Sequence, residues 1–412
     1  MSDTILRESD KIETKQGYKK TKLGWIPEDW EVIELGKIGE TITGLTYNPK
    51  MVSVNGVLVL RSSNVQDRQL KFDDNVFVDV DESNFNETEE GDIIICVRNG
   101  SRSLIGKNAI IDSANAGTAF GAFMLIFRSK EYRFLYQLFD THYYVREIHR
   151  NLGATINSIN TNNLKRFRFP FPPKDERKKI AKCLSTWDDA LVKIDQLITA
   201  KQKLKKALMQ QLLSGKKRLP GFMGEWEEKR LDYFFCERSE RNNEELLLLS
   251  IGEAGVYPQD DSNKKDTSNK DKSKYKKICV GDIGYNTMRM WQGRSALSNL
   301  EGIVSPAYTI VRPKKNTDSR FFAYLFKTPS IIHRFYRNSQ GMVSDTLNCK
   351  FKDFAPIKLV LPTSREEQTA IAEVLNTAAS EIELLKTQRE QLQAQKKGLM
   401  QQLLTGKKRL KC

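Results

Sequence analysis

The segment LMQQLLSGKKRL at residues 208–219 occurs a second time as LMQQLLTGKKRL at residues 399–410, and the two copies differ only at Ser214 and Thr405. They begin 191 residues apart in a chain of 412 residues, which is close to half its length. A repeat of this kind indicates two copies of one structural unit. The chain is therefore predicted to consist of two related halves.

Each copy ends a long segment in which apolar residues recur at alternating steps of four and three, the spacing of helices packed along a narrow seam. Prolines at 172, 173 and 362 precede these segments, and Gly215 and Gly406 end them. We predict two helices of about 38 residues, each about 57 Å long, that pack antiparallel as a coiled coil. The candidate residues for helix packing or partner docking are Ile180, Leu184, Leu191, Leu208, Leu212, Ile371, Leu375, Ile382, Leu399 and Leu403.

Charged residues interrupt this apolar seam toward the C-terminal part of each helix. They are Lys201 and Lys205 in the first helix and Arg389 and Lys396 in the second. Because a lone charge is costly to bury, packing is expected to weaken there.

A globular unit precedes each helix, and the two units share their order of motifs. Trp30-Glu31 and Trp226-Glu227 open them, and each is interpreted as an anchor to the helix or as an ordinary core tryptophan. Gly-Asp-Ile occurs at residues 91–93 and 281–283 and predicts a tight turn that enters a buried strand. Further strand runs are followed in each half by a short helix starting at RFLYQLF (133–139) or RFFAYLF (320–326).

These patterns predict an α+β protein in which two pseudo-symmetric α/β domains are separated by two long antiparallel, coiled-coil helices. The predicted segments are a flexible tail at 1–20, a first domain at 21–172, a helix at 173–218, a second domain at 219–362 and a second helix at 363–412.

Composition favours a cytoplasmic protein with a polyanionic partner. There are 67 Lys and Arg against 52 Asp and Glu, a net charge of +15, and nucleic acid is the leading candidate for such a surface. The mean hydropathy of −0.53 and the lack of a long apolar run predict no membrane span. No signal peptide is indicated at the N-terminus. The six cysteines form no CxxC pair, so we expect reduced thiols and no zinc site.

No catalytic or cofactor motif is found. Neither GxGxxG nor GxxxxGK[ST] occurs, and His142 and His149 lack a third metal ligand at a suitable spacing. The acidic pairs at 73–74, 188–189 and 260–261 are most simply solvated or turn residues. The chain is predicted to be non-enzymatic and to bind no cofactor of its own.

Two polar, basic loops occupy corresponding places in the two halves but differ in sequence, VRNGSRSLIGK (97–107) and YNTMRMWQGR (285–294). Arginine, lysine, asparagine and glutamine can bind base edges, and tryptophan can stack or wedge between bases. The candidate DNA-binding residues are Arg61, Arg98, Asn99, Arg102, Lys107, Asn286, Arg289, Trp291, Gln292 and Arg294. The lysine-rich segment 264–277 is interpreted as either a phosphate-contacting loop or a solvated one.

From about residue 20 onward the chain resembles the specificity (S) subunit of type I restriction-modification systems. The likeness rests on the repeated order of Trp-Glu, Gly-Asp-Ile, proline break, the helix starts ERKKIAKCL (176–184) and EEQTAIAEVL (366–375), and the duplicated ends. Glu176-Arg177 departs from the usual Glu-Gln, which is present as Glu367-Gln368; this affects only the start of the helix.

The resemblance implies that each domain is a target recognition domain that reads half of a bipartite site on double-stranded DNA. The helices would set the half-site spacing and dock methyltransferase (M) subunits, two of them in our prediction, which use S-adenosylmethionine. Restriction (R) subunits with ATP and magnesium could join. Two alternatives stay open: a self-contained methyltransferase or nuclease, and a coiled-coil adaptor that binds no DNA.

Overall fold

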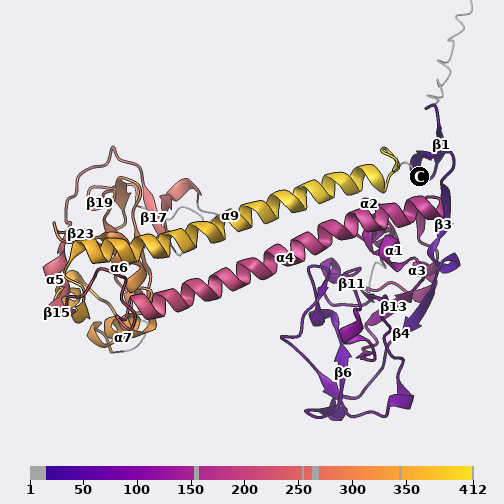
Figure 1. The fold of residues 1–412 in the computed structure, drawn as a ribbon, viewed down its shortest axis with the longest axis horizontal. Helices are drawn as coiled ribbons and strands as arrows, with labels where there is room; N and C mark the ends of the chain where they lie inside the picture. Colours follow the sequence, from indigo (N-terminus) through magenta and orange to yellow (C-terminus); the bar gives the residue numbers. More distant parts are fainter. Residues whose placement is uncertain (1–14, 153–156, 253–254, 262–268, 343–345, 411–412) are drawn as a thin grey trace, which may run out of the picture. The chain divides into compact units, whose positions relative to one another are not determined.

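A computed structural model of the chain describes residues 15–152, 157–252, 255–261, 269–342 and 346–410. The chain forms two compact units, one made of Met1–Lys193 and Arg389–Cys412 and the other of Ile194–Gln388. Each unit contains one globular domain and one part of each long helix (Figure 1).

The first unit is built on a four-stranded antiparallel sheet in the order β11-β10-β13-β4. Alternate residues of the central strands face two different cores, as the two-residue period of a strand requires. Ile93 and Ile95 face one core, whereas Ile94 faces the other. The strands are β4 (Glu40–Thr43), β10 (Ile93–Cys96), β11 (Asn108–Ile110) and β13 (Met124–Arg128).

Helices cover one face of this sheet, and a second sheet of order β12-β6-β9-β5 adjoins the other. The helices are α1 (Tyr132–Leu138), α2 (His142–Asn151) and α3 (Thr161–Lys165). The second sheet contains β5 (Val52–Ser53), β6 (Val57–Leu60), β9 (Phe77–Val78) and β12 (Ala119–Phe120). Two-stranded pairs are β1 (Tyr18–Thr21) with β2 (Gly24–Pro27), β3 (Glu31–Glu34) with β14 (Arg168–Phe171), and β7 (Val65–Gln66) with β8 (Gln69–Leu70).

The second unit repeats the main sheet strand by strand, in the order β16-β23-β20-β21. Its strands are β16 (Phe235–Glu237), β20 (Ile283–Asn286), β21 (Ser295–Leu297) and β23 (Tyr308–Pro313), and its helices are α5 (Leu231–Phe234), α6 (Ser319–Leu325), α7 (Pro329–Asn338) and α8 (Phe351–Phe354). Two-stranded pairs are β15 (Glu227–Arg230) with β24 (Lys358–Leu361), β17 (Leu249–Gly252) with β18 (Gly255–Pro258), and β19 (Lys276–Ile278) with β22 (Gly302–Val304). The predicted α+β class and the two related domains are confirmed.

Both central strands begin with the predicted Gly-Asp-Ile turn. Gly91 and Gly281 have φ angles of 89° and 90°, which glycine adopts without strain. The aspartate carboxylate then caps the turn, because Asp92 accepts a hydrogen bond from the Glu89 amide at 2.7 Å and Asp282 accepts one from the Cys279 amide at 2.8 Å.

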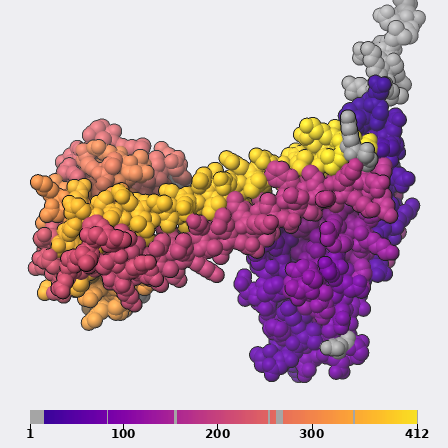
Figure 2. Space-filling model, in the orientation of Figure 1, coloured from indigo at the N-terminus to yellow at the C-terminus, as the bar shows by residue number. Residues whose placement is uncertain are grey.

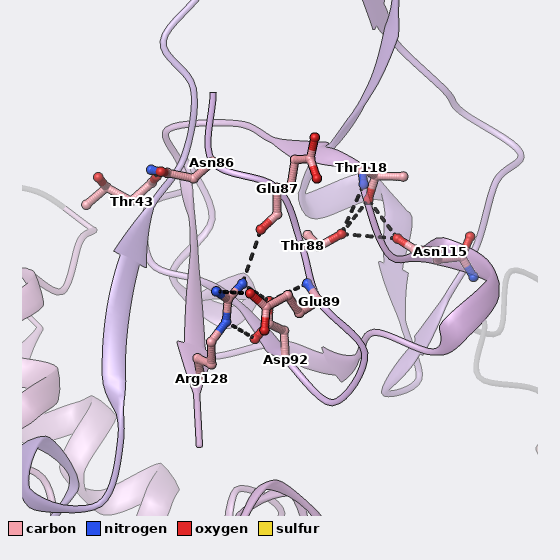
Figure 3. A network of polar contacts seen from close by, with 9 residues as sticks. All are labelled: Thr43, Asn86, Glu87, Thr88, Glu89, Asp92, Asn115, Thr118 and Arg128. Carbon is pink, nitrogen blue, oxygen red and sulfur yellow. Dashed lines mark hydrogen bonds and ion pairs between the residues drawn. The ribbon is translucent and has the colours of Figure 1, made fainter. Parts of the chain in front are cut away.

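An arginine binds each of these buried carboxylates, but from a different strand in each unit. Arg128, at the end of β13, donates to Asp92 through Nε and Nη2, both at 2.8 Å (Figure 3). Arg238, just after β16, donates to Asp282 through Nε at 2.7 Å. The same ion pair is thus formed in both domains, but the arginine comes from the strand next to the central one in the first domain and from just after the edge strand β16 in the second.

The long helices are α4 (Lys174–Leu212) and α9 (Arg365–Leu403), each of 39 residues. Within each unit they lie side by side and run antiparallel (Figures 1 and 2). In the second unit, Lys201 pairs with Glu381 at 2.7 Å. Both helices end before a glycine with φ of 71°, Gly215 or Gly406, as predicted.

In the first unit, Trp30 binds the start of α4. Its indole Nε1 donates to Glu176 Oε2 at 3.0 Å. Arg409, from the second copy of the repeated segment, donates to the same carboxylate at 2.7 and 2.8 Å and to Asp29 at 2.6 and 2.9 Å. The interpretation of this tryptophan as an anchor to its helix is confirmed, and it is also fully buried.

In the second unit, Trp226 Nε1 donates to Glu367 Oε1 at 3.2 Å. Arg218, from the first copy of the repeat, donates to Glu367 at 2.6 and 2.8 Å. Each copy of the repeated segment therefore closes the domain that belongs to the other half of the sequence.

The departure of Arg177 from the usual glutamine is accommodated at the helix start. Gln368 donates to the Pro362 carbonyl at 2.9 Å and accepts from the Asp318 amide at 2.9 Å. Arg177 donates to the Pro172 carbonyl at 2.6 Å and to Glu131 at 2.8 Å. Both side chains tie the long helix to the residue that precedes α6 or α1.

The candidate packing residues of the helices lie in or beside the two domain cores, except Leu191 and Ile382. Those buried are Ile180, Leu184, Leu212, Ile371, Leu375, Ile382 and Leu403; those partly buried are Leu191, Leu208 and Leu399. Leu403 packs in the core of the first unit and Leu212 in that of the second.

Two expectations about charged residues in the helices were wrong. Lys396 does not interrupt the packing of the two helices, because it is buried and donates to Asp188 Oδ1 at 2.5 Å. Asp188 is half-buried rather than fully solvated: 31% of its side chain is exposed, and it also accepts from Gln137 Nε2 at 2.6 Å. The lysine is tolerated because the carboxylate neutralises it.

The predicted tail at 1–20 overlaps an ordered strand. Residues 1–14 lie outside the described part of the chain, but β1 begins at Tyr18, whose hydroxyl donates to the Gly406 carbonyl at 2.9 Å. Along the ranges that the structure describes, no helix is long and apolar enough to cross a membrane.

Candidate nucleic-acid interface

The two predicted loops occupy the same place in the two domains. Residues 97–107 join β10 to β11, and residues 287–294 join β20 to β21. An equivalent backbone hydrogen bond fixes each loop start: the Val97 amide donates to the Phe123 carbonyl at 3.0 Å, and the Thr287 amide donates to the Ala307 carbonyl at 3.1 Å. Since the scaffold is equivalent, the differences lie in the side chains that it presents.

In the first unit, Arg98 and Asn99 lie at the sheet edge. Arg98 is exposed, and its guanidinium lies 5.7 Å from the ring centroid of Phe123, which is 55% exposed. Asn99 Nδ2 donates to Ser62 Oγ at 3.2 Å, and Asn157 donates to the Gly100 carbonyl at 2.9 Å. Arg98 is thus available to a ligand, whereas Asn99 is engaged in holding the loop.

Arg102 and Lys107 line a separate cavity of about 700 Å³ between the loop and α2. Arg68 and His149 are in the same wall. Arg68 is held firmly, because it donates to Asn108 Oδ1 at 2.9 Å and lies 3.8 Å from the ring centroid of Tyr136. The cavity is therefore lined by one fixed cation, Arg68, by the exposed Arg102 and by the half-buried Lys107.

Arg61 is placed differently from the other candidates. It precedes a short turn after β6, and its Nη2 donates to Asp74 Oδ2 at 3.0 Å. A DNA contact by Arg61 requires competition with this carboxylate.

In the second unit, two of the candidates hold the loop and three face solvent. Asn286 Oδ1 accepts from the Met288 amide at 3.0 Å, and Trp291 Nε1 donates to the Met288 carbonyl at 2.9 Å. The indole also contacts Tyr336 of α7, with ring centroids 6.1 Å apart. The exposed candidates are Arg289, Gln292 and Arg294.

The sequence did not single out a second cationic cavity beside this loop. It has a volume of about 610 Å³, and Lys276, Lys350 and Lys352 line it together with Thr287 and Thr309. The lysines come from segments more than 70 residues apart, so no local motif reveals them. Only Lys276 has a sequence signal, the lysine-rich run that ends at residue 277.

The structure corrects part of the interpretation of the lysine-rich segment 264–277. Residues 264–268 lie outside the described residues, but Lys276 and Lys277 belong to β19 rather than to a surface loop. Lys276 is buried, donates to the Tyr308 carbonyl at 2.8 Å and lies 3.7 Å from Glu237. Burial lowers the pKa of Lys276, and the attraction of Glu237 opposes that shift.

The described residues contain no group of three or more His, Cys, Asp or Glu side chains placed to hold a metal ion. Cys96, Cys183, Cys236, Cys279 and Cys349 are free thiols, and Cys412 lies outside the described part of the chain. Burial raises the pKa of Cys349 to about 12, which keeps this thiol protonated at neutral pH.

Two related α+β domains, each continuous with a long helix and each presenting a cationic loop at the same sheet edge, define a two-domain recognition protein. The family described as the type I restriction modification DNA specificity domain matches the chain twice, over residues 27–206 and 223–394. The chain belongs to this family.

Relatives match over the whole chain or over half of it. The chain is 31% identical to the putative type I restriction enzyme MjaX specificity subunit of Methanocaldococcus jannaschii, over 96% of this chain and 98% of that protein. It is 28% identical to the type I restriction enzyme EcoKI specificity subunit of Escherichia coli strain K12, over 47% of this chain and 44% of that protein.

A solved structure of a type I restriction-modification S subunit from M. genitalium has the same fold. Its TM-score is 0.57 at 17% identity, over 91% of this chain and 96% of that one.

Proposed function

We propose that this chain is the DNA sequence-specificity subunit of a type I restriction-modification complex and that each domain reads one half of a bipartite target. One observation carries the proposal: loops 97–107 and 287–294 leave equivalent strands but present different side chains. One scaffold used twice with different loops suits an asymmetric site with two unlike halves.

In this proposal the chain has no catalytic role. Two M subunits dock on it and methylate adenine with S-adenosylmethionine, and R subunits with ATP and magnesium complete the restriction complex. Family membership supports this over a self-contained enzyme or an adaptor that binds no DNA.

Base readout is assigned to loop side chains that are exposed, together with the half-buried Lys107. Arg98, Arg102 and Lys107 serve in the first domain, and Arg289, Gln292 and Arg294 in the second. Arginine binds guanine O6 and N7 in a bidentate manner, and glutamine binds adenine N6 and N7. Asn99, Asn286 and Trp291 keep the loops in shape.

The spacing between the half-sites is assigned to α4 and α9. A continuous helix of 39 residues extends about 58 Å. Its length sets a fixed distance that changes in the loops do not alter. Joining the two readers in one chain makes the second binding step intramolecular, which raises affinity by a factor of about 100 or more.

The test is co-expression with a cognate M subunit, followed by single-molecule sequencing of methylated adenines in the host DNA. The expected result is one motif with two short fixed blocks around a fixed gap. Methylation without such a motif, or a stable complex that methylates nothing, contradicts the proposal.

A further inference from the structure

The cavity of about 610 Å³ beside loop 287–294 is lined by three lysines, Lys276, Lys350 and Lys352, and by one carboxylate, Glu237. Lys350 and Lys352 form one wall, and Thr287, Thr309 and Asn348 also line it. The Thr287 hydroxyl already donates to the Ala307 carbonyl at 2.7 Å, and Asn348 Nδ2 donates to the Gln340 carbonyl at 3.1 Å. What the cavity offers to an anion is therefore the positive charge of its lysines.

The lysines in the wall differ in their engagement. Lys276 is held by the Tyr308 carbonyl and by Glu237. It therefore adds to the positive electrostatic potential of the cavity but offers no free hydrogen-bond donor. Lys350 and Lys352 are exposed, and neither forms an ion pair with any other described residue. Their charge is available to a ligand.

The first unit has no charge at the corresponding positions. The Ile159 amide donates to the Val97 carbonyl at 2.9 Å, and the Cys349 amide donates to the Thr287 carbonyl at 2.8 Å. A short helix, α3 or α8, follows directly in each unit. Asn160 and Asn162 therefore correspond to Lys350 and Lys352.

We propose that Lys350 and Lys352 bind backbone phosphates of duplex DNA, so that the second domain supplies salt-dependent affinity that the first domain lacks at this position. This rests on the proposed function. Lysine acts on phosphate as a point charge without reading sequence. The cavity is also lined by Met288, which precedes Arg289. A phosphate bound there would therefore place a DNA strand next to loop 287–294.

The experiment measures the dissociation constant of the full-length chain for two duplexes, its methylation target and a scrambled one, from low to high salt. Each phosphate contact contributes about 0.9 to the slope of log K against log salt. The double variant Lys350→Gln/Lys352→Gln is expected to lower that slope by about 1.8 on both duplexes. Affinity for both falls by the same factor at each salt concentration.

Lys315→Gln is the matched control. It removes the same charge from an exposed lysine beyond the opposite end of β23, a strand of six residues and hence about 20 Å long. We expect the control to leave the slope unchanged. The reciprocal variant Asn162→Lys is expected to raise the slope by about 0.9, because it restores one cation in the first domain.

The outcomes separate this inference from the function on which it rests. If the wild-type chain distinguishes its target but the double variant has the wild-type slope, the phosphate assignment fails alone. A loss confined to the target duplex also overturns it, since the lysines would then read bases. If the wild-type chain has no preference for its target, the proposed function itself fails.

Discussion

Trp30 and Glu176 are joined by a hydrogen bond of 3.0 Å from the indole to a carboxylate that is almost fully buried. The residues are 146 positions apart in the sequence. Arg409, which lies 233 positions beyond Glu176 in the sequence, donates to the same carboxylate. The first domain is therefore closed by the last residues of the chain, and its stability depends on them.

Arg409→Ala is expected to lower the free energy of unfolding by about 2 to 4 kcal/mol, because it leaves the buried Glu176 without its cation. Urea denaturation of the full-length chain measures this. Lys408→Ala removes an exposed neighbouring charge and should change stability by less than about 0.5 kcal/mol. Equal effects of the two variants would falsify the assignment of Arg409 as the partner of Glu176.

The repeat provides an internal control for the ion pair between the buried Lys396 and the half-buried Asp188. The lysine at the equivalent position in the first helix is Lys205, whose Nζ lies 5.4 Å from the ring centroid of Tyr324. Lys396→Met leaves Asp188 with its buried cation removed, whereas Lys205→Met removes a weaker cation–π contact. We expect a loss of about 2 kcal/mol for the first variant, because Asp188 is partly solvated, and about 1 kcal/mol or less for the second.

A double-mutant cycle checks the cause of that difference. If the unpaired carboxylate is responsible, Lys396→Met combined with Asp188→Leu should recover most of the loss. If the losses of unfolding free energy in the double variant are additive, they arise from lost packing and not from the unpaired charge.

Arg102→Ala and Arg289→Ala are each expected to weaken binding to the target duplex by about 1 to 3 kcal/mol, the value of a good bidentate base contact. Each should relax specificity in one half-site only, because the two residues lie in different domains. Methylation motifs of complexes carrying either variant provide the measurement. An equal loss on target and scrambled DNA would reduce that arginine to a phosphate contact.

Acid should weaken the closure of the first domain. The hydrogen bonds from Arg409 hold the pKa of Asp29 below its ordinary value. A carboxyl with a lowered folded pKa contributes stability above its unfolded pKa of about 4, and the contribution is lost as pH falls through the folded value.

The melting temperature of wild type should therefore exceed that of Asp29→Asn at pH 6. The difference should shrink below about pH 4. A difference that stays constant down to pH 3 would show that the effect is not one of ionisation.

The positions of the two candidate loops could be predicted because the repeat aligns the two halves. The Gly-Asp-Ile turns and the divergent loops 97–107 and 287–294 follow from local sequence, and the structure places the loops at equivalent strand ends. Lys350 and Lys352 were missed because a cavity collects residues that are distant in the chain. Asn286 and Trp291 were predicted to contact DNA bases, although their side chains already form local hydrogen bonds.

The sequence by itself determined the two-fold repeat, the α+β class and the two long helices, because hydrophobic period, glycine stops and proline breaks act over a few residues. Only the tertiary structure decided which repeated end closes which domain, that Arg238 replaces Arg128 from another strand, and that Lys396 is buried. These depend on contacts between distant segments, where a charge becomes acceptable only once its partner is in place.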